Sequence, residues 1–400
     1  MRSLEGKKVV LGVSGGIAVY KAVELLRLLV RAKIDVKVAM TKNATRFVSP
    51  LTFEALSKNR VIYDMWEGDG SSIGHIEWGQ GADLVIIAPA TANIIAKAAN
   101  GIGDDFLSTM LLAATAGIMF CPSMNSRMYE NQAVRENINR LKSRGAVIMA
   151  SGEGELACRT TGPGRLPEPA EIMEYASTLL APHDLTGLKI LITAGPTVEP
   201  MDPVRFISNR SSGKMGYSLA KAARRRGASV ILVSGPVCLE PPFDVTLLRT
   251  ETADEMEQAV FDKYRDCDII IKAAAVSDYR PKSREQNKIK KGPDSMKLEL
   301  VRNSDILGRL GKNKGESRFV LVGFAAETED LLENAGKKLT AKNLDMIVAN
   351  DVSASDAGFG TDTNRVKILY AGGEVEDIPL LGKDEVADIV LERAKQLLRK

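Results

Sequence analysis

The sequence predicts an α/β protein with two doubly wound, Rossmann-like domains whose sheets are mostly parallel. The chain has 400 residues, which is more than one hydrophobic core usually organises. Short apolar runs alternate with stretches of helical periodicity, the pattern of β-α-β units. The alternation starts again after a stretch rich in proline and glycine at 162–169, so we expect each half to form its own sheet.

The first half opens with a β-α-β unit. Residues 7–13 form an apolar run that ends in glycines, 17–31 have a helical pattern, and 36–40 form a second apolar run. Further buried strands are expected at 84–88, 118–121 and 146–150. Because strands alternate with helices, the sheet should be parallel and covered by helices on both faces.

The best linker candidate is the stretch at 162–169 together with a short helix at 170–180, which leads to Ala181-Pro182-His183-Asp184. The predicted domains are therefore 1–186 and 187–400. Strands of the second domain are expected at 190–194, 230–233, 269–274, 319–324 and 346–349. Between 280 and 293 the chain is polar and rich in lysine, which predicts a flexible loop that a ligand could order.

The composition is that of a soluble globular protein, with 44% hydrophobic and 26% charged residues. The formal charge of +3 and the lack of basic runs interleaved with aromatics argue against nucleic-acid binding. We also expect no membrane partner, because no apolar run approaches about 20 residues and the polar start lacks the pattern of a signal peptide. Cys121, Cys158, Cys238 and Cys267 are scattered, which disfavours a disulfide framework or zinc site and favours a reducing cytoplasm.

The loops after the first two strands indicate a phosphate site. Ligands of doubly wound sheets bind beyond the carboxyl ends of the strands. The glycines at 12–16 lack the GxGxxG spacing, and Thr41 stands where a ribose-binding acid is expected, so an NAD-dependent oxidoreductase is disfavoured. Ser14, Gly15 and Thr41 suit a monophosphate such as that of flavin mononucleotide (FMN). The alternative is that the glycines only shape the turn.

Later segments of the first half add residues at the same edge of the sheet. Ala90, Thr91 and Asn93 follow the strand at 84–88, and a PSMNSRMY segment follows the strand at 118–121. His75 lies in a predicted glycine-flanked loop, where it could act as a general base or be a structural histidine. Cys158 lies in a predicted mobile loop, unlike a buried structural cysteine.

The SGGIAVYK start, His75, the PSMNSRMY segment and the ELAC loop together resemble the flavoprotein cysteine decarboxylases of coenzyme A biosynthesis, over residues 1 to about 186. The sequence departs from the family pattern at Tyr129, usually Trp, and at Arg159, usually Gly. The resemblance implies a flavoprotein-type domain that decarboxylates 4′-phosphopantothenoylcysteine with FMN. His75 would then handle the proton of oxidation and decarboxylation, Asn125 would hold the substrate carboxylate, and Cys158 would donate the proton of the final reduction. The candidate FMN-binding residues are Ser14, Gly15, Thr41, Ala90, Thr91 and Asn93.

In the second half, residues 208–216 resemble a P-loop but are no Walker A motif. The first glycine is missing and Met215 stands where Ser or Thr is required. A Ser/Gly loop before a helix, here expected at 217–226, can still bind a phosphate, although an ordinary capped helix is the alternative. Lys338 and Lys342 are spaced i,i+4 and should share one side of a helix.

The segments ISNRSSGKMG, AAAVSDYRP, KIKK and GFAAET occur in the order seen in the phosphopantothenate–cysteine ligase family, which the chain resembles from about residue 187 to its end. Pro196 replaces a glycine common in that family. The resemblance implies that CTP activates 4′-phosphopantothenate to an acyl cytidylate, which the amine of cysteine attacks. Mg²⁺ would be held mainly through the CTP phosphates. Asn209 would handle the acyl intermediate, and Lys288 would serve both catalysis and nucleotide binding. The implied nucleotide-binding residues are Ala273, Ala274, Asp278, Lys288, Ser304, Asp305, Ile306, Leu307, Phe324, Lys338 and Lys342.

The two resemblances also imply assembly into a homo-oligomer, with trimers of the flavin domain, dimers of the ligase domain and possibly a dodecamer. Flavin sites in this family lie between subunits. A different class of function is a flavoprotein-like regulatory binding module that has lost one or both activities. The presence of His75, Asn125 and Cys158 argues against that alternative.

Overall fold

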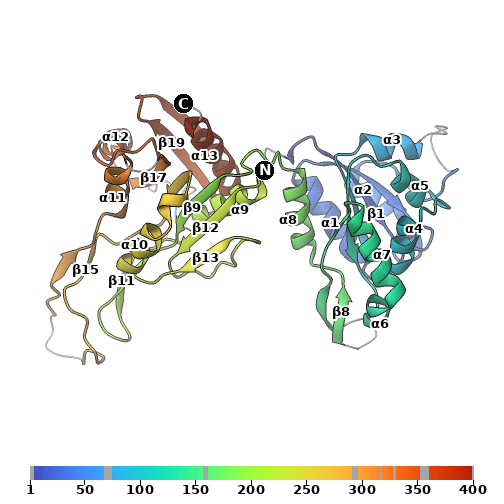
Figure 1. Cartoon of the computed structure of the whole chain (residues 1–400), viewed down its shortest axis with the longest axis horizontal. Coiled ribbons are helices and arrows are strands. Elements are labelled where there is room, and N and C mark those ends of the chain that lie inside the picture. The colour runs from blue at the N-terminus through green and yellow to red at the C-terminus, as the bar shows by residue number, and fades with distance from the viewer. Residues whose placement is uncertain are drawn as a thin grey trace. The chain divides into compact units, whose positions relative to one another are not determined.

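The computed structural model describes residues 4–66, 74–155, 161–290, 296–315, 318–327, 330–351 and 360–398. The chain divides into two compact units, Met1–Ala181 and Pro182–Lys400. Each unit has a mostly parallel sheet with helices on both faces, which confirms the predicted fold class (Figure 1). Among the described residues, no helix is both long enough and apolar enough to cross a membrane.

The sheet of the first unit has six parallel strands in the order β3-β2-β1-β4-β5-β6. The strand order reverses between β1 and β4, which is where doubly wound sheets bind ligands. The strands are β1 (Lys8–Val13), β2 (Asp35–Met40), β3 (Val61–Ile62), β4 (Leu84–Ala90), β5 (Gly117–Pro122) and β6 (Val147–Ile148).

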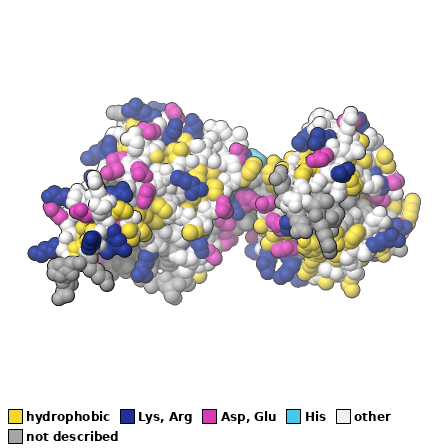
Figure 2. Space-filling view, turned by 90° about the horizontal axis from the view of Figure 1, so that it is seen from below, with side chains coloured by type: hydrophobic (Ala, Val, Ile, Leu, Met, Phe, Trp, Pro, Cys, Tyr) yellow, Lys and Arg dark blue, Asp and Glu magenta, His cyan; other side chains and the backbone are white. Residues whose placement is uncertain are grey.

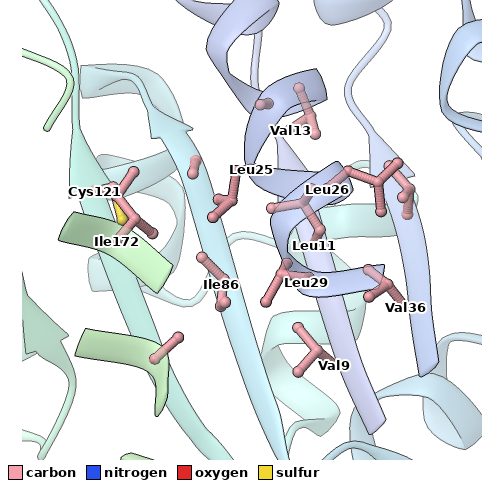
Figure 3. Packing of buried hydrophobic residues seen from close by; sticks show 14 of the residues in the cluster. Val9, Leu11, Val13, Leu25, Leu26, Leu29, Val36, Ile86, Cys121 and Ile172 are labelled. Atoms are coloured by element: carbon pink, nitrogen blue, oxygen red, sulfur yellow. The ribbon is translucent and has the colours of Figure 1, made fainter. Parts of the chain in front are cut away.

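Two helical layers cover this sheet. Strand β1 alternates, with Val9 and Leu11 in one hydrophobic cluster and Val10 in the other. One layer consists of α1 (Val19–Arg31), α2 (Pro50–Ser57) and α8 (Pro169–Leu180). The other consists of α3 (Gly74–Gly81), α4 (Ala92–Asn100), α5 (Phe106–Ala113) and α7 (Gln132–Ser143). Figure 3 shows Leu25 and Leu29 of α1 lying over β1 and β4.

Two expectations for this unit are wrong. Residues 161–165, within the predicted linker region, form β8 (Thr161–Arg165), which pairs antiparallel with β7 (Gly152–Glu155). The helix predicted at 170–180 is confirmed as α8, but it belongs to the core of the first unit and not to a linker, since Ile172 is fully buried. His75 lies in the first turn of α3 and not in a loop, because the helix begins at the glycine that precedes it.

The sheet of the second unit has eight strands in the order β13-β12-β9-β14-β17-β18-β19-β20. Neighbouring strands are parallel from β13 to β18, whereas β19 and β20 are antiparallel. The strands are β9 (Lys189–Ala194), β12 (Ser229–Ser234), β13 (Thr246–Arg249), β14 (Ile269–Lys272), β17 (Val320–Glu327), β18 (Met346–Asp351), β19 (Thr363–Tyr370) and β20 (Val375–Gly382). The sequence did not predict β19 and β20, because their polar and apolar residues alternate and form no continuous apolar run.

The helices of the second unit also lie on both faces. On one face are α9 (Lys214–Arg225) and α13 (Lys383–Leu398), and on the other are α10 (Ala253–Phe261), α11 (Ile306–Asn313) and α12 (Leu331–Ala341). Two short antiparallel ribbons complete the described part of the unit: β10 (Val198–Pro200) with β11 (Phe206–Ser208), and β15 (Tyr279–Pro281) with β16 (Leu300–Arg302). Charged side chains of both signs are interspersed on the face seen in Figure 2.

Candidate functional sites

A cavity of about 1110 Å³ lies at the carboxyl edge of the first sheet. The loops after β1, β2, β4 and β5 contribute to its lining, as does the chain at the end of β8. Six of the predicted site residues line it: Ser14, Gly15, Thr41, Thr91, Asn93 and Asn125. Ala90 is fully buried at the end of β4, and His75 is not among the lining residues. Cys158 lies outside the described residues.

Ser14 ties the loop after β1 to the loop after β4. Its hydroxyl donates to the carbonyl oxygen of Pro89 at 2.7 Å and accepts from the backbone N–H of Thr91 at 3.0 Å. The Oγ1 of Thr91 lies 3.0 Å from the same oxygen. The side chain is buried, so these bonds replace hydration and fix the start of α4. Ser14 therefore shapes the wall of the cavity by holding Thr91 in place.

Gly15 permits a close approach between two loops. A Cβ atom at this position would lie 2.5 Å from Cβ of Asn43 and 2.7 Å from its carbonyl carbon. No larger residue fits without movement of the loop after β2. This close approach supports the alternative that Gly15 is needed for the shape of the loop. Binding of a phosphate at this loop stays a prediction.

Asn125 is placed by the hairpin of β7 and β8. Its Oδ1 accepts from the N–H of Arg127 at 2.9 Å and caps the short helix α6 (Ser126–Glu130). The preceding Met124 donates its N–H to the carbonyl oxygen of Gly164 in β8 at 2.9 Å. Gly164 has φ +118°, and a Cβ there would lie 2.2 Å from the carbonyl oxygen of Met124. Strand β8 therefore packs directly on the loop that presents Asn125 to the cavity.

His75 lies beside the cavity wall but does not line the cavity. A Cβ on its neighbour Gly74 would be 3.9 Å from Cε2 of Phe106, which does line the cavity. Trp78, one turn further along α3, packs edge-on against the Phe106 ring at 5.3 Å. The structure thus places His75 next to the site without bringing it into contact with Asn125.

One cluster in this cavity was missed by the sequence analysis. The Nζ of Lys97 lies 2.6 Å from Asp104 and 2.8 Å from Asp105, and all three residues line the cavity. Burial disfavours the charge on Lys97, but the hydrogen bonds to the two carboxylates outweigh it and raise the pKa of the lysine. In the sequence, the only sign of this cluster is the pair of acids Asp104 and Asp105 directly after Gly103. Their partner Lys97 could be identified only from the fold.

Cys121 packs in the hydrophobic core of the first unit. It is fully buried in β5 (Figure 3), and burial raises the pKa of the thiol.

In the second unit, the side chain of Asn209 is hydrogen-bonded to the segment that follows β14. Its Nδ2 donates to the carbonyl oxygen of Ala275, which also accepts from the N–H of Thr197 at 3.2 Å. The Oγ1 of Thr197 accepts from the N–H of Ser277 at 3.0 Å. The turn after β9, the end of β11 and the segment after β14 are therefore joined at one edge of the sheet.

The same edge holds several of the predicted nucleotide-binding residues. Asp278 accepts the N–H of Asn303 through its carbonyl oxygen at 2.9 Å, which brings the start of α11 beside the segment after β14. Asp305 caps the start of α11, and its Oδ2 lies 2.8 Å from Nζ of Lys342, the C-cap residue of α12. The Ser304 hydroxyl is hydrogen-bonded to Glu257 of α10.

The remaining predicted nucleotide-binding residues differ in exposure. Ile306 and Leu307 are buried in the core, so only their backbone N–H groups at the start of α11 could reach a ligand. Ala273, Ala274 and Phe324 are partly buried near the ends of β14 and β17. Lys338 is exposed on α12, one turn before Lys342, and the two lysines share one side as the sequence predicted.

Lys288 is exposed in the loop between β15 and β16. The next residue, Ile289, donates its N–H to Oδ2 of Asp202 at 3.1 Å and accepts from Arg205 at 3.1 Å. The buried Asp202 carboxylate also accepts from the N–H groups of Val204 and Arg205, both at 2.7 Å. The lysine-rich loop is therefore anchored immediately beside Lys288.

Among the described residues, no group of His, Cys, Asp and Glu side chains is arranged to hold a metal ion. A magnesium ion held mainly through the phosphates of a nucleotide stays a prediction, since such an ion takes only one or two carboxylates from the protein.

The fold is that of a two-unit α/β protein with a large cavity at the carboxyl edge of the first sheet. Residues 1–180 match the Flavoprotein family model, and residues 185–398 match the model for the DNA/pantothenate metabolism flavoprotein C-terminal domain. The coenzyme A biosynthesis bifunctional protein CoaBC of Bacillus subtilis (strain 168) is 50% identical over 399 residues, which cover 98% of each chain. The protein of the same name from Escherichia coli (strain K12) is 45% identical over 98% of this chain and 97% of its own. A solved C-terminal domain of a protein with this name is 46% identical and covers 54% of this chain and 98% of that chain, with a TM-score of 0.47.

The chain belongs to the family of coenzyme A biosynthesis bifunctional proteins. This membership confirms the family and the bifunctional enzymatic role that the sequence motifs predicted. The alternative of a regulatory binding module is not supported.

Proposed function

We propose that residues 1–186 decarboxylate 4′-phosphopantothenoylcysteine with FMN as the cofactor. The observation that carries this proposal is the cavity of about 1110 Å³ at the point where the strand order reverses, because it exceeds the space that a single cofactor needs. Its walls combine the loop of Ser14 and Gly15 with the start of α4 at Thr91, where backbone N–H groups suit a phosphate. When bound, FMN supplies the two-electron sink that loss of carbon dioxide requires.

The chain's own residues orient the substrate and move protons. The Asn125 amide, held at the start of α6, binds the carboxylate that is lost. Cys158 donates the proton that accompanies the final reduction.

His75 serves the cavity of a neighbouring copy in this proposal. Within one chain it lies outside the lining, beside Phe106. The rim of the cavity also carries large exposed apolar side chains, with Ile17 61%, Tyr20 59% and Trp66 90% exposed. Apolar groups of this size around a cavity are typical of surfaces that another subunit covers. We therefore propose a homo-oligomer, with trimers of the first domain and dimers of the second, possibly a dodecamer.

For residues 187–400 we propose the preceding reaction, in which CTP activates 4′-phosphopantothenate and cysteine attacks the acyl cytidylate. The convergence of Asn209, Asp278, Asp305 and Lys342 at one sheet edge supports this assignment. Lys288 stabilises the charge that develops on phosphorus, and Mg²⁺ offsets part of the triphosphate charge. Both reactions are assigned to the cytoplasm.

The deciding experiment supplies the full chain with 4′-phosphopantothenate, cysteine, Mg²⁺ and either CTP or ATP, and identifies the products by mass spectrometry. We expect a yellow protein that forms CMP, pyrophosphate and 4′-phosphopantetheine with CTP. A colourless protein that does not bind added FMN would contradict the first assignment. Failure to form 4′-phosphopantothenoylcysteine with either nucleotide would contradict the second.

A further inference from the structure

Lys272 has no role in the reactions proposed above, yet it occupies the centre of the second sheet. It is the last residue of β14 and lies between Thr193 of β9 and Gly323 of β17. Strand order reverses between β9 and β14, so Lys272 ends a strand at the point where doubly wound sheets bind ligands. The segment that follows it carries Ala273 and Ala274, which are predicted nucleotide-binding residues.

The side chain of Lys272 is directed to the face covered by α11 and α12. Ile270, two residues earlier in β14, belongs to the cluster with Ile306 of α11 and Leu339 of α12. Side chains two residues apart in a strand lie on the same face, so Lys272 shares that face. On this face Asp305 is the N-cap of α11 and Lys342 is the C-cap of α12.

Within the part of the chain that the structure describes, three charged residues on three segments act on Lys272. They are Lys342 of the α12 terminus, Asp305 of the α11 terminus and Asp278 of the segment after β14. Asp305 is already engaged, since its carboxylate binds Lys342 at 2.8 Å and the N–H of Gly308 at 3.0 Å. On the neighbouring strands, Thr193 and Gly323 carry no charge.

The ammonium group of Lys272 is therefore poorly compensated. Burial and then repulsion by Lys342 lower its pKa to about 8, although Asp305 and Asp278 act in the opposite direction. A lysine in this state gains most from an anion that arrives beside it, because a new negative charge favours the protonated form. A triphosphate would supply that charge at the sheet edge.

We propose that Lys272 binds the phosphate groups of the nucleotide in the ligase domain and takes up a proton when the nucleotide binds. The inference rests on the nucleotide site proposed above and adds a residue to it. The side chain is partly buried, and its lowered pKa makes Lys272 lose its proton more readily than an ordinary lysine does. Nucleotide binding then favours the ammonium form. Affinity for the nucleotide therefore falls as the pH rises above 8.

The test measures CTP binding to the full-length protein with Mg²⁺ by calorimetry at pH 8, in two buffers with different ionisation enthalpies. The difference between the buffers gives the number of protons taken up per CTP. Lys272→Met should weaken CTP binding roughly 10-fold to 100-fold and abolish the lysine's share of proton uptake. Lys272→Arg should keep most of the affinity without that proton uptake, because arginine remains charged. Lys312→Met, at an exposed position of α11, is the matched control and should behave like the wild type.

The outcomes separate this inference from the ligase assignment. If the wild type binds CTP and Lys272→Met binds it equally well with the same proton uptake, the role of Lys272 is refuted. If the wild type binds no CTP while it still decarboxylates 4′-phosphopantothenoylcysteine, the nucleotide site itself is wrong and the inference falls with it. Should Lys272→Met not fold, Lys272→Arg decides, because undiminished proton uptake in that variant would overturn the proposal.

Discussion

At the scale of single residues, the two sites depend on close backbone approaches and on buried polar groups. Ser14 and Gly15 are adjacent, yet they act differently: the hydroxyl of Ser14 holds the start of α4, whereas Gly15 leaves room for the loop after β2. In the second unit, the buried carboxylate of Asp202 accepts hydrogen bonds from three backbone N–H groups. These contacts place the loops that carry the predicted ligand-binding residues.

We expect Gly15→Ala to impair FMN binding and to destabilise the first unit by about 1–3 kcal/mol, because the added Cβ would lie 2.5 Å from Cβ of Asn43. The neighbouring Gly16→Ala is the control, since a Cβ there would meet only Cγ2 of Thr91 at 3.6 Å. Flavin absorbance of the purified variants and their urea denaturation check both effects. Equal behaviour of the two variants would show that the loop is not tightly packed.

Lys288→Gln should lower the rate of CTP-dependent ligation by about 100-fold or more and leave decarboxylation of added 4′-phosphopantothenoylcysteine unchanged. The reason is that only a fixed positive charge can offset the charge developing on phosphorus. Lys263→Gln removes an exposed lysine elsewhere in the second unit and is the matched control. Loss of both activities in Lys288→Gln would contradict the division of labour between the domains.

At the scale of elements, buried ion pairs fasten the start of the second unit to its helices. Asp184 accepts from Nε of Arg226 at 2.8 Å and from its Nη2 at 2.6 Å, and it also binds Lys395 of α13. The guanidinium of Arg226 is buried and also binds Glu392 at 2.7 Å. The sequence analysis assigned Asp184 and Leu185 to the first domain, 1–186. In the structure both belong to the second unit, and Leu185 is part of its core.

Asp184→Ala should destabilise the second unit by about 3 kcal/mol, because it leaves the buried Arg226 with one carboxylate fewer. Asp377→Ala, which breaks an exposed pair with Lys367, should cost less than about 1 kcal/mol and serves as the control. Denaturation in urea measures both. If both substitutions lowered the free energy of unfolding equally, burial would not explain the contribution of the Asp184–Arg226 network.

The contribution of Asp184 should also depend on pH. The hydrogen bond from Arg226 holds the pKa of this carboxyl far below its usual value, even though burial opposes that shift. Its stabilising effect is therefore complete above the unfolded pKa of about 4 and is lost as the pH falls below it. The difference in stability between wild type and Asp184→Ala should narrow in that acidic range.

At the scale of the whole molecule, each unit has its own hydrophobic interior. The clusters that contain Leu11 and Ile87 are built from residues of the first unit alone. Those that contain Ile192 and Leu321 are built from residues of the second unit alone. Both units are large enough to bury such cores independently.

We therefore expect the fragments 1–181 and 182–400 to fold separately. Each should show a cooperative thermal transition by circular dichroism, the first should bind FMN, and the second should form 4′-phosphopantothenoylcysteine from 4′-phosphopantothenate, cysteine and CTP. A full-length sample provides the reference for both activities. Failure of either fragment to unfold cooperatively would contradict independent domains.

The sequence by itself determined the fold class, the family and most of the residues at the sheet edges. These features follow from local patterns, since buried parallel strands are continuous apolar runs and ligand loops follow their carboxyl ends. Asn125, Asn209 and Asp305 were named as site residues from the resemblance to the two families, and their roles stay predictions. The sequence analysis missed strands β19 and β20, because polar and apolar residues are mixed along both strands and give a weaker apolar signal than a buried parallel strand.

Only the tertiary structure decided which side chains share an environment. Lys97 with its two carboxylates, and Lys272 beside Lys342, depend on segments that meet through the fold. It also showed that His75 lies outside the lining of its own cavity. The physical reason is that burial and electrostatic coupling arise from distances in space, which the order of residues along a chain does not contain.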